Sequence, residues 1–146
     1  MAEDAKALVR SLIADHAMPV SWHPGVATAC WHYAEVRDTL AAFAANPKFR
    51  AVRHVVQDER DDRFILGGDF NRGVSALRDF GLVYDILIFE RQLAASIEFV
   101  DRHPKQIFVL DHIAKPRIKD GVIEPWRARI RDIAKRTNVY CKVSGM

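Results

Sequence analysis

Residues 108–116, with the sequence FVLDHIAKP, place an aspartate, a histidine and a lysine directly after an apolar stretch typical of a buried strand. In an α/β protein, such a strand delivers polar side chains to the carboxyl edge of a sheet, where ligands bind. The imidazole of His112 can bind a divalent metal or polarise a carbonyl group there. Asp111 points to the opposite side of a regular strand, so we expect it to orient a neighbour or cap the next turn. A capped turn without chemistry is the alternative.

Charged side chains also end or interrupt three other apolar stretches that are typical of strands. Arg53 and His54 end the first stretch, and only one of them can face a pocket, because neighbouring strand residues point to opposite sides. We expect His54 to face the pocket and Arg53 to pair at its rim. Asp85 and Lys142 interrupt the other two. Since isolated buried charges are costly, they either pair with each other or face a polar pocket, and a structural pair is slightly favoured over a catalytic one.

Composition excludes several classes of protein. The chain has 146 residues, of which 49% are hydrophobic, so it can form one domain with a core. The formal net charge is only +3, and the basic residues of 127–136 fit a solvated helix face, so no nucleic-acid partner is expected. There is no signal-peptide pattern and no apolar run of membrane-spanning length. With only two distant cysteines, Cys30 and Cys141, we expect a cytoplasmic protein with no membrane partner, and Cys141 as a packed thiol.

The hydrophobic pattern predicts strands and helices in alternation. Helices are predicted over residues 3–16, 33–45, 72–80, 91–102 and 125–136, and strands over 18–22, 49–56, 82–89, 108–111 and 138–143. Gly81 stands where the end of a helix favours a left-handed residue. Strands of nearly unbroken hydrophobicity that alternate with helices indicate parallel βα units, and only short turns separate these units. We therefore expect a single domain without an internal linker.

Four blocks of the chain, taken in order, resemble the amidohydrolase-related (amidohydrolase 2) family. They are FRAVRH at 49–54, YDILI at 84–88, LDHIAKP at 110–116 and CKVSG at 141–145. Within the family, the chain is similar to the sugar-lactone and 2-pyrone-4,6-dicarboxylate lactonases, which are (β/α)8 barrels. The resemblance covers roughly residues 40–146. It implies an α/β fold that is a partial (β/α)8 TIM barrel, with about strands four to seven and their helices.

The chain also departs from the pattern of this family. It has no His-x-His pair, which the family carries at the end of its first strand, and it ends at Met146, before the family's Ser-Asp-Trp-Pro-like motif. That motif supplies an acid/base aspartate. A glycine usual in the family is replaced by Ala114, which is tolerable if its backbone φ is negative. We therefore expect one incomplete barrel domain over residues 1–146, with residues 1–33 poorly matched to the family.

The resemblance implies a hydrolase that opens a sugar-acid or related lactone with an activated water, assisted in the full-length parent by one divalent metal ion such as zinc. It also implies roles for seven side chains at the carboxyl edge. The expected catalytic residues are His112, His54 and Lys115, with His112 also the expected metal ligand; the expected substrate-binding residues are Arg53, Asp85, Arg117 and Lys142. Lys115 and Arg117 would hold a carboxylate that such lactones carry or generate. A solvated loop is the alternative for these two.

The missing motifs lead to a second hypothesis. Without the first-strand histidines and the acid/base aspartate, we expect this chain alone to hydrolyse lactones poorly or not at all. The alternative function is a non-catalytic half-barrel that self-associates and so covers its two open sheet edges. A module that binds a small ligand without turnover is the third hypothesis.

Overall fold

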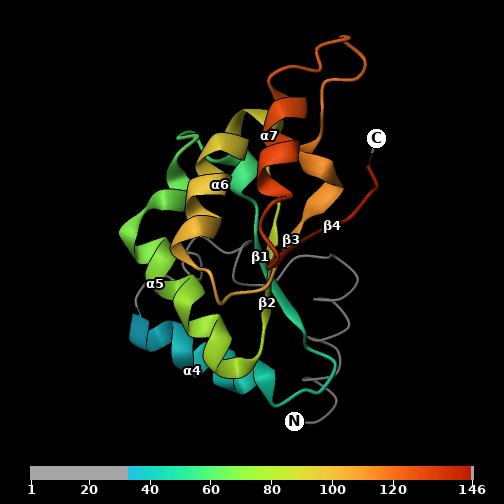
Figure 1. The fold of residues 1–146 in the computed structure, drawn as a ribbon. Helices are drawn as coiled ribbons and strands as arrows, with labels where there is room; N and C mark the ends of the chain where they lie inside the picture. The colour runs from blue at the N-terminus through green and yellow to red at the C-terminus, as the bar shows by residue number, and fades with distance from the viewer. Residues whose placement is uncertain (1–32, 146) are drawn as a thin grey trace.

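In the part of the chain that the structure describes, four parallel strands lie side by side in chain order and form a sheet (Figure 1). The computed structural model describes residues 33–145. The strands are β1 (Ala51–His54), β2 (Val83–Ile86), β3 (Phe108–Leu110) and β4 (Val139–Cys141). In the ladder, Val83 pairs with Ala51, and Phe108 pairs with both Tyr84 and Val139. Consecutive parallel neighbours in this order are the arrangement found in a (β/α)8 barrel, of which this sheet is a part.

Helices precede the first strand and connect each later pair. They are α4 (Tyr33–Ala44), α5 (Gly68–Leu77), α6 (Leu93–Arg102) and α7 (Trp126–Ile133). Five short 3-10 helices complete the connections: η1 (Val56–Asp58), η2 (Phe64–Leu66), η3 (Arg78–Phe80), η4 (Glu90–Gln92) and η5 (Asp111–Ala114). Among residues 33–145, no helix is both long enough and apolar enough to cross a membrane.

The core lies between the helices and one face of the sheet. Side chains at alternate strand positions are buried there, because successive strand residues point to opposite faces. Tyr84 contacts Phe70 of α5, Phe99 of α6 and Phe108, and Phe99 also contacts Phe70 and Phe108; the ring centroids are 5.2–6.3 Å apart, with edges set against faces. Such rings contribute a large buried area in a favourable geometry. This aromatic layer fixes which strand residues face the helices and which face the other side.

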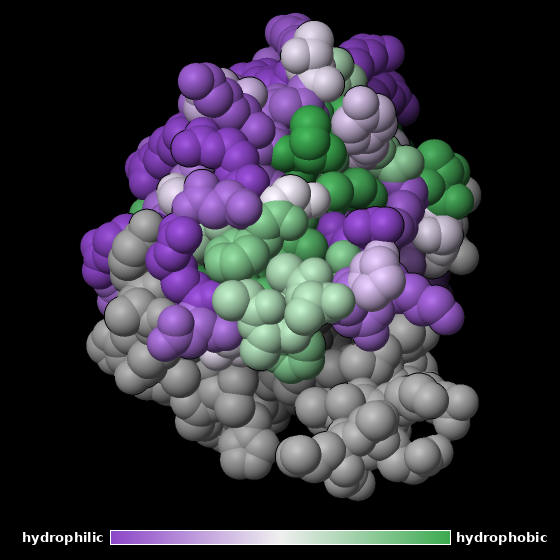
Figure 2. All heavy atoms as spheres, turned by 90° about the horizontal axis from the view of Figure 1, so that it is seen from below, coloured by the Kyte–Doolittle hydropathy of each residue, from purple (hydrophilic) through white to green (hydrophobic). Residues whose placement is uncertain are grey.

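The opposite face of the sheet carries less cover. Tyr140 on β4 is 60% exposed, and Val143 just after that strand is 73% exposed. Cys141 is the register partner of Leu110, which faces the helices, but it too is exposed, so the expectation of a packed thiol is wrong. Figure 2 shows a different side of the molecule, seen from below the view of Figure 1, where hydrophobic residues gather in one area that hydrophilic residues border.

The predicted alternation of helices and strands is confirmed for residues 33–145. The helix expected over 33–45 is α4, and Gly81 adopts the left-handed conformation with φ 63°. The strands are shorter than expected: β2 ends at Ile86, although Leu87 and Ile88 beyond it are buried. Burial without ladder pairing explains this difference, because hydrophobicity reports burial rather than hydrogen bonding. The helix expected over 3–16 and the strand expected over 18–22 lie outside the described residues.

Candidate active site at the carboxyl edge of the sheet

Four charged side chains form a network on the face of the sheet that points away from the helices. Arg53 and Asp85 are ladder partners on β1 and β2, while Asp111 and Lys142 directly follow β3 and β4. The Nζ of Lys142 lies 2.9 Å from Asp85 Oδ2 and 3.0 Å from Asp111 Oδ1. Arg53 Nη1 lies 3.2 Å from Asp111 Oδ2. The expected pair of Asp85 and Lys142 is therefore present, and Asp111 joins it to Arg53.

Burial differs sharply among the members of this network. The Asp111 side chain is 1% exposed, whereas Lys142 is 50% exposed and so presents its ammonium group at the edge of the sheet. Burial raises the pKa of Asp85, against the lowering effect of its hydrogen bond with Lys142. For Lys142 itself, burial lowers the pKa, but the hydrogen bonds with Asp85 and Asp111 outweigh it and leave the pKa raised. Lys142 therefore stays a cation, held in place from below by two carboxylates.

The segment after Asp111 turns in the left-handed direction. His112, Ile113, Ala114 and Lys115 have φ angles of 53°, 46°, 56° and 48°. Residues with a Cβ pay about 1–2 kcal/mol each for this conformation, and four in succession without a glycine are unusual. The condition of a negative φ at Ala114 is thus not met. Strained backbone of this kind persists only where its surroundings hold it, and it is concentrated at functional sites.

Three hydrogen bonds hold the left-handed turn. Trp126 Nε1 at the start of α7 donates to Ile113 O at 2.7 Å, and Ile113 N donates to Lys142 O at 3.2 Å. Lys115 N donates to His112 O at 2.8 Å and closes the turn. The turn is therefore tied both to α7 and to the end of β4.

The same turn orients the imidazole of His112. Its Nδ1 lies 3.0 Å from Ser144 Oγ. A Cβ at Gly145, where φ is 68°, would lie 2.6 Å from that nitrogen, so only glycine fits at this position. Among the described residues, Nε2 of His112 has no hydrogen-bond partner. Ser144 thus fixes the ring and leaves Nε2 available to a ligand.

The two cations of the loop have different surroundings. The Lys115 ammonium contacts Gln57 Oε1 and lies 5.0 Å from the centroid of the Phe89 ring. Burial is the main cause that lowers the pKa of Lys115. Arg117 is exposed and pairs with Asp120 of its own loop at 2.9 Å. Lys115 is therefore anchored near the carboxyl edge, whereas Arg117 fits the solvated-loop alternative.

The expected sides of Arg53 and His54 are wrong. His54 is buried on the helix side, where its ring stacks on Phe64 at 5.1 Å and its Nε2 lies 2.7 Å from Glu59 Oε1. Arg53 faces the network on the other side. The reason is the two-residue period of the strand: Val52 is buried against the helices, so His54 must be too.

The described residues do not by themselves form a metal centre. Within 33–145, no group of three His, Cys, Asp or Glu side chains lies close enough together to hold an ion. Structural and catalytic zinc sites need at least three protein ligands. His112 offers one imidazole, and the carboxylates of Asp85 and Asp111 are engaged with Lys142 and Arg53. We therefore assign no step of the chemistry in this part of the chain to a metal.

Sequence reasoning missed the central place of Asp111 and the supporting roles of Ser144 and Trp126. The spacing of Asp111 two residues beyond Val109, which is the register partner of Asp85, could have placed it on the network face. The contact of Ser144 and the turn contact of Trp126 depend on the left-handed backbone, for which the sequence has no glycine signal.

Comparison with known proteins agrees with this architecture. The model of the Amidohydrolase family (Amidohydro_2) matches residues 3–146, which includes residues 3–33, for which the motifs gave no match. The chain is 36% identical over 107 residues to an L-fucono-1,5-lactonase of Burkholderia ambifaria, which covers 73% of this chain and 37% of that protein. It is 43% identical over 105 residues to an L-fucono-1,5-lactonase of Burkholderia multivorans, covering 68% of this chain and 36% of that protein. The chain thus spans just over a third of the length of these relatives.

A solved structure extends the similarity. A zinc-bound amidohydrolase of Burkholderia multivorans superposes with a TM-score of 0.71 at 36% identity, over 98% of this chain and 50% of that one. The match of the family model over nearly all of the sequence, together with the parallel βα architecture, shows that this chain belongs to the amidohydrolase family.

Proposed function

We propose that this chain forms the carboxyl-edge part of a lactone hydrolase that opens a sugar-acid lactone. The observation that carries the proposal is the oriented His112, with a free Nε2, on the same sheet edge as the half-exposed Lys142. The two L-fucono-1,5-lactonase relatives support the class of substrate.

Lactone hydrolysis requires groups that stabilise negative charge on oxygen. Water adds to the ring carbonyl, the carbon–oxygen bond of the ring breaks, and the ring oxygen takes a proton, which leaves a hydroxy acid. Hydrogen-bond donors and cations near the carbonyl oxygen lower the barrier, because charge develops there in the transition state. In our proposal, protonated or neutral His112 donates from Nε2 to this oxygen. Lys142 and Lys115 hold the carboxylate that forms.

The network beneath gives these groups fixed positions. Asp111 is buried and touches both Lys142 and Arg53, so Lys142 cannot fold away from the edge without leaving a buried carboxylate partly unpaired. Arg53 acts in this proposal as a positioning residue beneath the edge. A divalent ion would need ligands beyond His112 that residues 33–145 do not supply. We therefore expect slow turnover or none by residues 33–145 alone.

Titration calorimetry with an aldonate, L-fuconate, tests the proposal without depending on turnover. We expect binding by the chain, weakened about tenfold in Lys142→Gln, because one charge-assisted contact is lost. Lys119→Gln changes an exposed cation on the neighbouring loop and is the matched control, with unchanged affinity expected. Equal affinity for L-fuconate and for the neutral sugar L-fucose, or equal effects of both variants, would contradict the proposal.

The exposure of Tyr140 and Val143 favours one other candidate, self-association through the open face near β4. In that case a second copy of the chain covers this face, and the two share a C2 interface. Sedimentation equilibrium distinguishes the two candidates: a dimer that Tyr140→Lys dissociates supports self-association, and a monomer at all concentrations contradicts it.

A further inference from the structure

A pocket lies at the end of the molecule opposite the carboxyl edge of the sheet, where the carboxyl ends of α5 and α6 lead toward the amino ends of β2 and β3. Its volume is about 270 Å³. The polar residues that line it include Ser75, Arg78, Arg102, His103 and Lys105. None of these residues belongs to the network at the carboxyl edge. The pocket is thus a separate feature of the helix layer.

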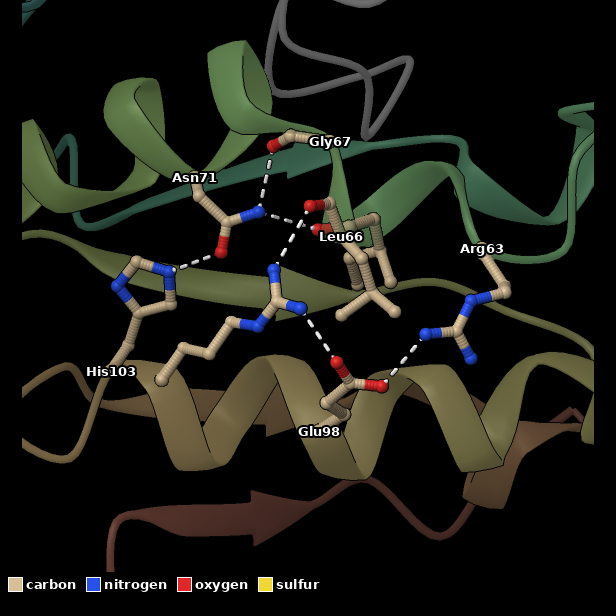
Figure 3. A network of polar contacts seen from close by, with 8 residues as sticks. Arg63, Leu66, Gly67, Asn71, Glu98 and His103 are labelled. Carbon is tan, nitrogen blue, oxygen red and sulfur yellow. Dashed lines mark hydrogen bonds and ion pairs between the residues drawn. The ribbon is translucent and has the colours of Figure 1, made fainter.

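The hydrogen bonds of Asn71 determine the protonation of His103. Asn71 Nδ2 donates to Gly67 O at 2.7 Å and to Ile65 O at 3.0 Å, so its Oδ1 is the atom that faces His103 Nε2 at 2.8 Å (Figure 3). Nε2 must therefore carry a proton and donate, and Nδ1 of the neutral ring has none. Ser75 Oγ, 3.5 Å from Nδ1, donates its proton to Asn71 O at 2.8 Å. Nδ1 therefore lacks a well-placed donor.

The charges around the pocket are positive and only partly neutralised. Arg102 donates to Glu98 Oε1 at 2.6 Å and to Leu66 O at 3.0 Å, as Figure 3 shows. The side chains of Arg78 and Lys105 make no hydrogen bond or ion pair with the rest of the described chain. Burial lowers the pKa of His103, and Arg102 and Arg78 lower it further. A cation at a helix end often only offsets the helix dipole. Two such cations beside a ring nitrogen that becomes a donor when it is protonated suit an anion.

We propose that this pocket binds a dianionic tetrahedral oxyanion, such as a phosphoryl or sulfate group, through Arg78, Lys105 and protonated Nδ1 of His103. A protonated Nδ1 becomes a donor, so the anion and the proton bind together. The pocket is large enough for a phosphate ester of a small molecule as well as for the free ion. The site does not depend on the proposed lactone hydrolysis.

The proposal makes binding depend on pH in a defined direction. The polar and charged groups around His103 are Ser75 and Asn71 from α5, Arg78 from η3, Arg102 at the end of α6, Lys105 in the same pocket lining, and Asn138, whose amide donates to His103 O. None of them is a carboxylate, so a bound dianion is the group that favours the protonated ring. The bound anion raises the pKa of His103, and its affinity is therefore full below that pKa and falls as pH rises through it.

Nuclear magnetic resonance of the His103 ring tests this site. Sulfate is the probe because it keeps its charge over the whole range of histidine titration, and chloride at equal ionic strength corrects for screening. We expect sulfate, at concentrations up to about 0.1 M, to raise the pKa of His103 by about one relative to chloride. In Arg78→Gln/Lys105→Gln the rise should disappear. Arg127→Gln, which removes an exposed arginine of α7, is the control in which it should persist.

Two further titrations, with glycerol 3-phosphate and with inorganic phosphate, identify the source of the oxyanion. Tighter binding of glycerol 3-phosphate than of inorganic phosphate assigns the pocket to phosphate esters, and equal binding assigns it to the free ion. An equal pKa of His103 in sulfate and chloride overturns the proposal. So does a rise that the double variant retains, because the response would then come from elsewhere.

Discussion

The two faces of the sheet hold their side chains by different physical means. On the helix side, Phe70, Tyr84, Phe99 and Phe108 interlock, and the close packing alone fixes their positions. On the other side, four charges hold one another through Asp111, next to a strained backbone turn. Packing tolerates little change in volume, whereas a charge network tolerates little change in protonation or partner. The first arrangement suits stability, and the second suits a site that exchanges partners with a ligand.

The largest effect should come from the helix side. Phe99→Ala removes a fully buried ring that contacts four other rings, and we expect it to lower the free energy of unfolding by about 4 kcal/mol. Tyr140→Ala removes a ring of similar size from the open face and should cost less than about 0.5 kcal/mol. Urea unfolding measures both. Similar losses in the two variants would show that the open face is packed too.

Removal of the central carboxylate should have the next largest effect. Asp111→Asn removes the buried negative charge that contacts both Arg53 and Lys142, so we expect a loss of about 2 kcal/mol in the free energy of unfolding. The cost falls below that of a fully buried pair because Lys142 is half exposed and keeps Asp85. Asp120→Asn, in an exposed pair with Arg117, is the control and should change stability little. A neutral effect of Asp111→Asn would mean that the network does not contribute to folding.

The support of the left-handed turn should have a smaller effect on stability. Trp126→Phe keeps most of the ring but removes the hydrogen bond to Ile113 O, and we expect a cost of about 1 kcal/mol. Because that bond holds the turn that carries His112, the affinity for L-fuconate should fall as well. Thermal unfolding together with calorimetry separates the two effects. Lost stability with unchanged affinity would show that the turn holds its shape without Trp126.

The smallest expected effect is on the pH dependence of stability, and it comes from His103 at the end of α6. Burial, with Arg102 and Arg78, lowers the pKa of His103 below its ordinary value of 6.5. The unfolded chain then binds more protons, so His103 favours folding above this value and loses that contribution as pH falls below it. Urea midpoints between about pH 7 and 5 should therefore decline more in the native sequence than in His103→Gln. Equal declines would contradict this assignment.

The sequence predicted the helices and strands because hydrophobic periodicity reports which side chains are buried. The strand side chains that pack in the aromatic layer against the helices are buried in this way. The sequence also predicted the pair of Asp85 and Lys142, since the cost of an isolated buried charge requires a partner, and the structure gives that pair at 2.9 Å. The side taken by His54 followed from the burial of Val52 but was assigned wrongly. The left-handed turn after Asp111 could not be predicted, because none of the four residues with positive φ is a glycine. Its contacts with Ser144 and Trp126 arise from tertiary structure alone.

We propose that the carboxyl edge, rather than the opposite end of the molecule, binds the sugar-acid ligand. The most direct test is a titration of the chain with L-fuconate, followed through the ring signals of His112 and His103 in the same spectra. We expect the signals of His112 to shift with saturation while those of His103 stay constant. Unchanged signals of His112 in the folded chain, or a response at His103 alone, would contradict it.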